Sequence, residues 1–223
     1  MIRVNRSVLV LVALVLAAPL AQAADVQLRL MPGSKLWLTG TSTIHEYSST
    51  ASKLDVLFGH EGAAWNAALP RGEAIEKLIQ QHGVTSIELI VAVKGLHSGK
   101  DGLDKNMYKA LLAEKHPEIR FAMTGYDVHG GSKSGELAID AKGKLSIAGV
   151  EKDQAIAATA VREGDAVRLR GRVPLKMTQF KIKPPTMMMG TLRTSDDVTI
   201  QFDLLIGAGD APLAGTQAKG AGR

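Results

Sequence analysis

The sequence VRLRGRVPLK, residues 167–176, alternates apolar and basic side chains over most of its length. Val167, Leu169, Val173 and Leu175 fall on one side of the alternation, and three arginines and one lysine fall on the other. Successive side chains of a β-strand point to opposite faces, so a period of two predicts a strand with one buried and one solvated face.

The same alternation recurs through the chain, separated by turn signals rich in glycine, proline and aspartate. Closely spaced strands with hairpin-like connections favour an antiparallel sheet, and closure into a barrel removes the exposed edges that an open sheet would leave. We therefore predict an all-β fold with two short helices, a lipocalin-like antiparallel β-barrel of about eight strands. The clear strand patterns cover residues 87–93, 119–123 and 198–204, and weaker ones cover 26–31, 36–39, 43–58, 137–147 and 155–161.

Two segments show helical rather than strand periodicity. Residues 73–81 place Ile75, Leu78 and Ile79 on one face, and Gly83 is a suitable C-terminal stop. A second helix is predicted over residues 101–114, with Asp101 as its N-cap. Neither segment alternates with parallel-type strands, so we expect lids or plugs on a β-barrel, not βαβ crossovers.

The two ends of the chain differ in composition from its middle. Arg3 and Arg6 precede an apolar run over residues 8–18 and the triplet Ala21-Gln22-Ala23, which is typical of a signal peptide cleaved after residue 23. The apolar run is too short to cross a bilayer core, which needs about 20 residues. We expect a barrel domain over residues 24–207, a disordered tail over 208–223, and a soluble periplasmic protein without a stable membrane anchor.

Charge and cysteine content exclude several function classes. The formal charge of +5 becomes +3 when the two arginines of the signal peptide are subtracted, and no dense basic run with interleaved aromatics is present. Nucleic acid is therefore not an expected partner. The absence of cysteine removes disulfides and thiolate chemistry. No histidine pair has metal-site spacing and no serine lies in a nucleophile elbow, so no catalytic residue, metal or cofactor is predicted.

Three adjacent methionines, residues 187–189, lie between a proline pair and Gly190. A methionine is a flexible apolar side chain whose thioether also suits Cu(I). The segment is therefore open to three interpretations: it packs into the barrel mouth, it lines an apolar ligand cavity, or Met187 and Met189 bind Cu(I). Met187 and Met189 are the candidate copper ligands because alternate side chains of an extended segment point to the same side.

Four stretches of the chain form a recognisable series of motifs: GTSTIHEY (40–47), KGLHSGKDGLDKNM (94–107) with HPEIRF (116–121), GKLSIAGVEK (143–152), and PPTMMMG (184–190) with VTIQFD (198–203). In this order they resemble the YceI-like family, which comprises lipocalin-like periplasmic proteins that bind polyisoprenoids or other lipids. Glu46-Tyr47 departs from the Asp-Trp pair usual in the first motif. The resemblance implies an extended antiparallel barrel that holds a long isoprenoid or similar chain in its interior, without catalysis.

The alternation and the resemblance together indicate which side chains would face a ligand inside the barrel. The second helix would act as a lid, and Lys100, Lys181 or Lys183 would meet a polar head at the mouth. The alternatives are a periplasmic Cu(I)-binding protein and a ligand-free structural or stress-related interaction module with an exposed apolar patch. The candidate ligand-binding residues are Leu89, Val91, Val93, Met107, Leu111, Phe121, Met123, Leu169, Val173, Met187, Met189, Ile200 and Phe202.

Overall fold

The computed structural model describes residues 26–187 and 192–210. The predicted signal peptide and Met189 lie outside these ranges. The α-helices are α1 (Arg71–Gln80) and α2 (Asp101–Ala110), and the 3-10 helices are η1 (Gly62–Ala64), η2 (Val93–Gly95) and η3 (Met177–Phe180). The strands are β1 (Val26–Leu30), β2 (Lys35–Ser42), β3 (Glu46–Ala51), β4 (Asp55–His60), β5 (Val84–Ala92), β6 (Leu96–His97), β7 (Glu118–Gly130), β8 (Glu136–Ile147), β9 (Val150–Glu163), β10 (Ala166–Lys176), β11 (Thr186–Met187) and β12 (Leu192–Asp210).

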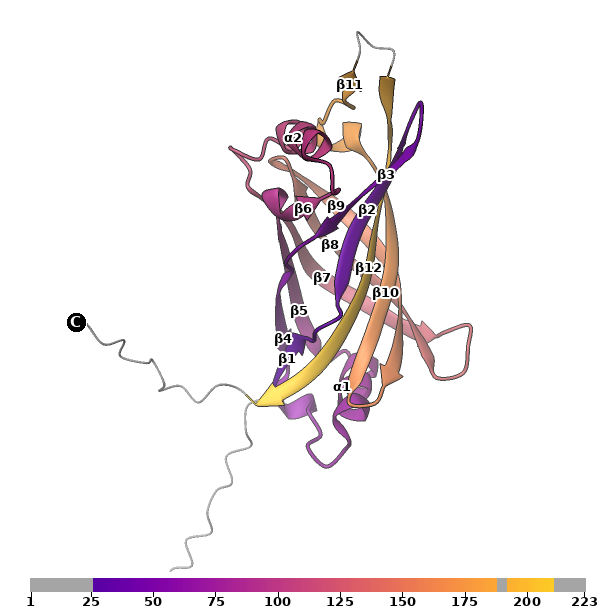
Figure 1. Cartoon of the computed structure of the whole chain (residues 1–223). Coiled ribbons are helices and arrows are strands. Elements are labelled where there is room, and N and C mark those ends of the chain that lie inside the picture. The colour runs from indigo at the N-terminus through magenta and orange to yellow at the C-terminus, as the bar shows by residue number, and fades with distance from the viewer. Residues whose placement is uncertain (1–25, 188–191, 211–223) are drawn as a thin grey trace, which may run out of the picture.

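All of these strands belong to one curled antiparallel sheet in the order β4-β5-β7-β8-β9-β10-β12-β2-β3-β6, with β1 and β11 paired to β12. The strand β12 runs the length of the molecule and pairs first with β2 and then with β1 (Figure 1). The predicted fold class is confirmed. More than eight strands form because β6 and β11 are two-residue pairings and residues 43–58 divide into β3 and β4.

The two ends of the sheet approach each other through short segments. At one end β6 pairs with β3, through Thr50 opposite His97. At the other end β1 lies against β4, where Nε2 of His60 contacts the carbonyl oxygen of Val26 at 2.5 Å. A carbonyl oxygen only accepts a hydrogen bond, so Nε2 carries the proton and Nδ1 of the neutral ring does not.

The register of β10 against β12 confirms the predicted alternation. Val173 lies opposite Ile200 and Leu169 opposite Leu204, so the apolar sides of both strands face the interior together. Gly171 interrupts the series because the ring of Phe202, its partner on β12, occupies the space that a β-carbon at 171 would need. The missing side chain at position 171 is thus replaced by an aromatic ring from the neighbouring strand.

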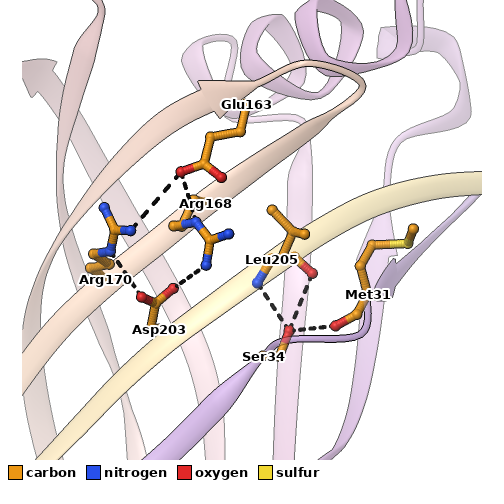
Figure 2. A network of polar contacts seen from close by, with 7 residues as sticks. All are labelled: Met31, Ser34, Glu163, Arg168, Arg170, Asp203 and Leu205. Atoms are coloured by element: carbon orange, nitrogen blue, oxygen red, sulfur yellow. Dashed lines mark hydrogen bonds and ion pairs between the residues drawn. The ribbon is translucent and has the colours of Figure 1, made fainter.

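Charged side chains on the outer side of these strands are joined in ion pairs (Figure 2). Arg168 contacts Asp203 at 2.7 Å and Glu163 at 2.7 Å, and Arg170 contacts Asp203 at 3.0 Å. Burial is the largest single influence on the pKa of Asp203 and raises it, but the hydrogen bonds and charges of Arg168 and Arg170 together outweigh it, so the pKa lies below its usual range.

The hydroxyl of Ser34 donates to the carbonyl of Met31 at 2.8 Å, which fixes the turn between β1 and β2.

The helix α1 covers one end of the barrel (Figure 1), and Ile75 and Leu78 on it are fully buried. The predicted stop at Gly83 is displaced by one residue, because His82 takes the left-handed conformation with φ of 58°. The amides of His82 and Gly83 donate to the carbonyls of Ile79 and Leu78, which is the Schellman pattern.

The helix α2 lies near the opposite end and is shorter than the predicted 101–114. It ends at Ala110 because Leu112 takes the left-handed conformation with φ of 54°, and the amides of Leu112 and Ala113 donate to the carbonyls of Lys109 and Tyr108. The N-cap position is occupied by Lys100, one residue before the predicted Asp101, and its side chain makes no capping bond.

The final strand extends beyond the predicted domain boundary at residue 207. It continues to Asp210 because β1 supplies a pairing partner there, with Gln27 opposite Gly209 and Leu28 opposite Ala208. Ala208 is buried in the core cluster beside α1. The first residues of the predicted tail therefore belong to the barrel, and residues 211–223 lie outside the described ranges.

Candidate functional site: an apolar barrel interior

A long cavity runs through the barrel interior and is lined by 28 residues, whose side chains are all aliphatic or aromatic. They come from β1, β2, β4, β5, β7, β8, β9, β10, β12, α1 and the first residue of β6. The space open to the centre of a water molecule is about 170 Å³. Because native cores contain few voids larger than one water, an apolar space of this size is unusual for a packed interior.

The end of this cavity beside α1 is closed. Ile75 and Ile79 on α1 line it, and Tyr126 on β7 contributes its ring. The hydroxyl of Tyr126 donates to the carbonyl of Ile79 at 3.1 Å and lies 3.4 Å from the amide of Val84. Burial raises the pKa of this hydroxyl. The one polar group among the lining residues is therefore satisfied by backbone.

A second cavity of about 150 Å³ lies at the other end, between α2, β3, η3 and β12. It shares Leu38, Ile119 and Ile200 with the first cavity, so these three side chains border both spaces. Its lining is apolar except for Tyr47, Ser49, Asn106, Lys176 and Thr194. The interior thus has an apolar closed end and a partly polar end beneath α2.

Most of the predicted ligand-binding residues lie on these two cavities, and the structure leaves their contact with a ligand as a prediction. Ile200 lines both cavities, and Met107 on α2 and Leu111, the residue after its end, line the second. Seven other predicted residues line the first cavity: Leu89, Val91, Phe121, Met123, Leu169, Val173 and Phe202.

The remaining predicted residues are placed differently. Val93 lines neither cavity: β5 ends at Ala92, and Val93 begins η2 as a fully buried residue whose amide donates to the carbonyl of Pro117. The backbone of Met187 in β11 pairs with that of Leu192 in β12, and Met189 lies outside the described residues. The three lysines predicted to meet a polar head, at positions 100, 181 and 183, are exposed and line neither cavity.

A polar cluster fixes α2 over the second cavity. The carboxylate of Asp104 on α2 accepts hydrogen bonds from the amide of Ser98 at 2.8 Å and from its hydroxyl at 2.5 Å. The hydrogen bond from the Ser98 side chain is the main cause that holds the pKa of Asp104 below its usual range; the Ser98 amide and nearby His97 add to it, and burial opposes it. The hydroxyl of Tyr108 donates to the carbonyl of Leu96 at 2.7 Å.

Two of the polar lining residues, Tyr47 and Ser49, were absent from the predicted site. Both follow the GTSTIH stretch in β3, where the sequence reads Glu-Tyr-Ser-Ser-Thr and polar side chains occupy both faces. A strand pattern without apolar alternation does not reveal which face is buried. The sequence does indicate that Tyr47 and Ser49 share one face of the strand, because they are two residues apart.

The described residues provide neither clustered ligands for a metal ion nor a membrane-spanning helix. Within residues 26–187 and 192–210, no group of three or more His, Asp or Glu side chains is arranged to hold a metal ion. No helix in the same ranges is long and apolar enough to cross a membrane. This finding does not bear on Met187 and Met189 as Cu(I) ligands, because the side chain of Met187 and the whole of Met189 lie outside the described residues.

A curled antiparallel barrel with two short helices and an apolar interior defines a lipocalin-like fold. The family model for the YceI-like domain matches residues 39–206, about three quarters of the 223 residues. The chain therefore belongs to the YceI-like family, as the four sequence motifs predict. No curated protein matches the chain.

Solved structures with the same fold are distant in sequence. BcnA from Burkholderia cenocepacia is 15% identical, with 77% of this chain and 95% of that chain covered and a TM-score of 0.57. A polyisoprenoid-binding domain from Saccharophagus degradans, implicated in plant cell wall breakdown, is 13% identical, with 85% and 99% covered and a TM-score of 0.55. The YceI protein of Campylobacter jejuni is 14% identical, with 74% and 84% covered and a TM-score of 0.50.

Proposed function

We propose that this protein binds a long apolar lipid, with an isoprenoid chain as the first candidate, inside its barrel and without changing it chemically. The observation that carries the proposal is the first cavity, whose lining side chains are apolar except for the hydroxyl of Tyr126, which is bonded to backbone. Such a lining offers a hydrocarbon chain contact along its length and offers a polar ligand no hydrogen bond.

The driving force is the removal of apolar surface from water, worth about 0.8 kcal/mol for each buried methylene-sized group. A chain that buries ten such groups would gain roughly 8 kcal/mol before the costs of immobilising it are subtracted. The cavity is already formed, so little ordering of the protein is needed. Micromolar binding requires about 8 kcal/mol net, so a chain has to bury more than about ten such groups to reach it once the costs of immobilising it are subtracted.

Three further observations support the proposal. The chain belongs to the YceI-like family, and one protein of the same fold is described as a polyisoprenoid-binding domain. Tyr126 is the one lining residue of the first cavity with a titratable side chain; its hydroxyl is bonded to backbone, and burial raises its pKa. The lining offers no carboxylate, imidazole or amine for acid, base or nucleophilic catalysis. The predicted signal peptide over residues 1–23 supports a periplasmic location.

The test is to extract purified protein from a bacterial host with organic solvent, identify the lipid by mass spectrometry, and titrate delipidated protein with geranylgeraniol. Ala141→Leu narrows the cavity from β8 and is expected to weaken binding. Ala155→Leu is the matched control, because Ala155 lies on the exposed face of the neighbouring β9. Absence of lipid in repeated preparations together with no binding of the added chain would contradict the proposal.

A further inference from the structure

Ser49 on β3 is a buried polar group whose partner is absent from the described structure. The residue is 1% exposed, and its Oγ has no hydrogen bond to any of the residues that the structure describes. Buried hydroxyl groups in native proteins are normally hydrogen-bonded, because a hydroxyl that loses its bond to water and gains no other bond costs free energy. Ser49 is one of the residues that line the second cavity, so its unpartnered hydroxyl belongs to the wall of that space.

The strand register places Ser49 where the two cavities meet. Ser49 lies opposite Leu38 on β2, and Leu38 in turn lies opposite Ile200 on β12. Leu38 and Ile200 line both cavities. Ser49 therefore lies beside the side chains that border both cavities, on the side of the second cavity, where a chain that extended from the first cavity toward α2 would reach it.

Tyr47 borders the same space on the side away from the first cavity. Its register partner is Gly40, and its ring and hydroxyl occupy the volume that a β-carbon at position 40 would need. Burial raises the pKa of the Tyr47 hydroxyl, so the group is neutral and can donate a hydrogen bond at physiological pH. Both hydroxyl-bearing side chains of the inner face of β3 thus line the second cavity.

The charges around the second cavity do not suit an anionic ligand. Lys176 is the only basic residue that lines it within the described ranges, and its Nζ is paired with Asp197 at 2.6 Å. A phosphate or carboxylate in this space would lose its hydration without an uncommitted cation to replace it, which is costly. An uncharged oxygen needs a single hydrogen bond, and Ser49 offers one.

We propose that the second cavity holds an uncharged oxygen-bearing head, an alcohol or a carbonyl, that ends the apolar chain and hydrogen-bonds to the Ser49 hydroxyl. The inference rests on the proposed function, since it assigns one end of a ligand whose chain lies in the first cavity. It adds the chemical class of the head and the orientation of the ligand. The head lies beneath α2 and the chain extends toward α1.

The test compares three probes with one C20 isoprenoid skeleton: geranylgeraniol, geranylgeranyl monophosphate and the hydrocarbon that lacks the oxygen. The wild-type protein is expected to bind the alcohol more tightly than the phosphate or the hydrocarbon. Ser49→Ala is expected to weaken alcohol binding about threefold to tenfold, which is the usual worth of one hydrogen bond, and to leave hydrocarbon binding unchanged. Ser48→Ala is the matched control, because the neighbouring Ser48 is exposed on the outer face.

The hydrocarbon titration separates the two proposals. Hydrocarbon binding with equal alcohol affinity in Ser49→Ala and wild type would overturn the assignment of the head while the proposed function stands. Tighter binding of the phosphate than of the alcohol would overturn it as well. Failure of all three probes to bind would remove the proposed function, and the inference with it. Unchanged hydrocarbon binding by Ser49→Ala also shows that the variant is folded, so loss of alcohol affinity alone supports the inference.

Discussion

Replacement of Asp104 tests whether the polar cluster beneath α2 holds that helix over the cavity. The Asp104 side chain is 11% exposed and accepts two hydrogen bonds from Ser98 through one carboxylate oxygen. Hydrogen bonds to a charged group contribute about 1.5 to 3 kcal/mol each. Because the two bonds share one acceptor atom, we expect Asp104→Ala to cost about 2 to 4 kcal/mol in the stability of this region.

The contribution of Asp104 to stability is expected to depend on pH. The pKa of Asp104 is lower in the folded protein than its usual value, so the ionised carboxylate stabilises the fold above the unfolded pKa of about 4. That contribution is lost as the pH falls through the lower, folded pKa. Asp104→Asn keeps the shape of the side chain and lacks the charge, so its stability is expected to lie below wild type at pH 7 and to approach it in acid.

The assay is urea denaturation followed by tryptophan fluorescence, combined with hydrogen exchange of the α2 amides. The exchange measurement is needed because α2 can detach locally while the barrel stays folded. Faster dissociation of a bound lipid is also expected, since Met107 on α2 and Leu111 at its C-terminal end line the second cavity. If Asp104→Ala alters neither the unfolding free energy nor α2 exchange beyond about 0.5 kcal/mol, the hydrogen bonds do not hold the helix.

Three further predictions concern the core, the N-terminus and the methionines. Gly171→Ala is expected to destabilise the fold by about 1 to 3 kcal/mol in urea denaturation, because the new methyl group meets the Phe202 ring, whereas Gly125→Ala, with open space around it, has little effect. Mass spectrometry of the exported protein is expected to show Ala24 as its first residue, and an intact N-terminus would contradict the signal peptide. If the alternative copper hypothesis holds, the protein binds Cu(I) stoichiometrically and replacement of Met187 and Met189 by alanine abolishes binding; equal binding by the variant would reject these ligands.

Helix boundaries show where local sequence signals are insufficient. The apolar faces of both helices are evident from spacing, but their ends are set by His82 and Leu112, whereas glycine is the usual left-handed residue at a helix end. Tertiary packing compensates for the cost of these conformations. The core side chains Ile75 and Leu78 on α1 hold that helix against the barrel. The helix ends at Gln80, and residues 81–83 lead from it to Val84, the first residue of β5.

The candidate site divides in the same way. Eight of the predicted residues on the clearly alternating strands line the barrel interior, since alternation alone assigns a side chain to the inner or outer face. Val93 does not, because the strand ends one residue before it, a change that hydrophobicity does not signal. Ser49 could not be predicted, because β3 has polar residues on both faces and only the neighbouring strands decide which face is buried.

The sequence by itself determined the fold class, the faces of the alternating strands and the family, because each depends on residue order over short ranges. Tertiary structure alone decided that the inward faces leave a cavity instead of a filled core. The reason is that the empty volume depends on side chains from many strands that meet across the barrel, which no single segment encodes. It also decided that α1 closes one end, and that the polar residues Ser49 and Tyr47 lie beneath α2 at the other.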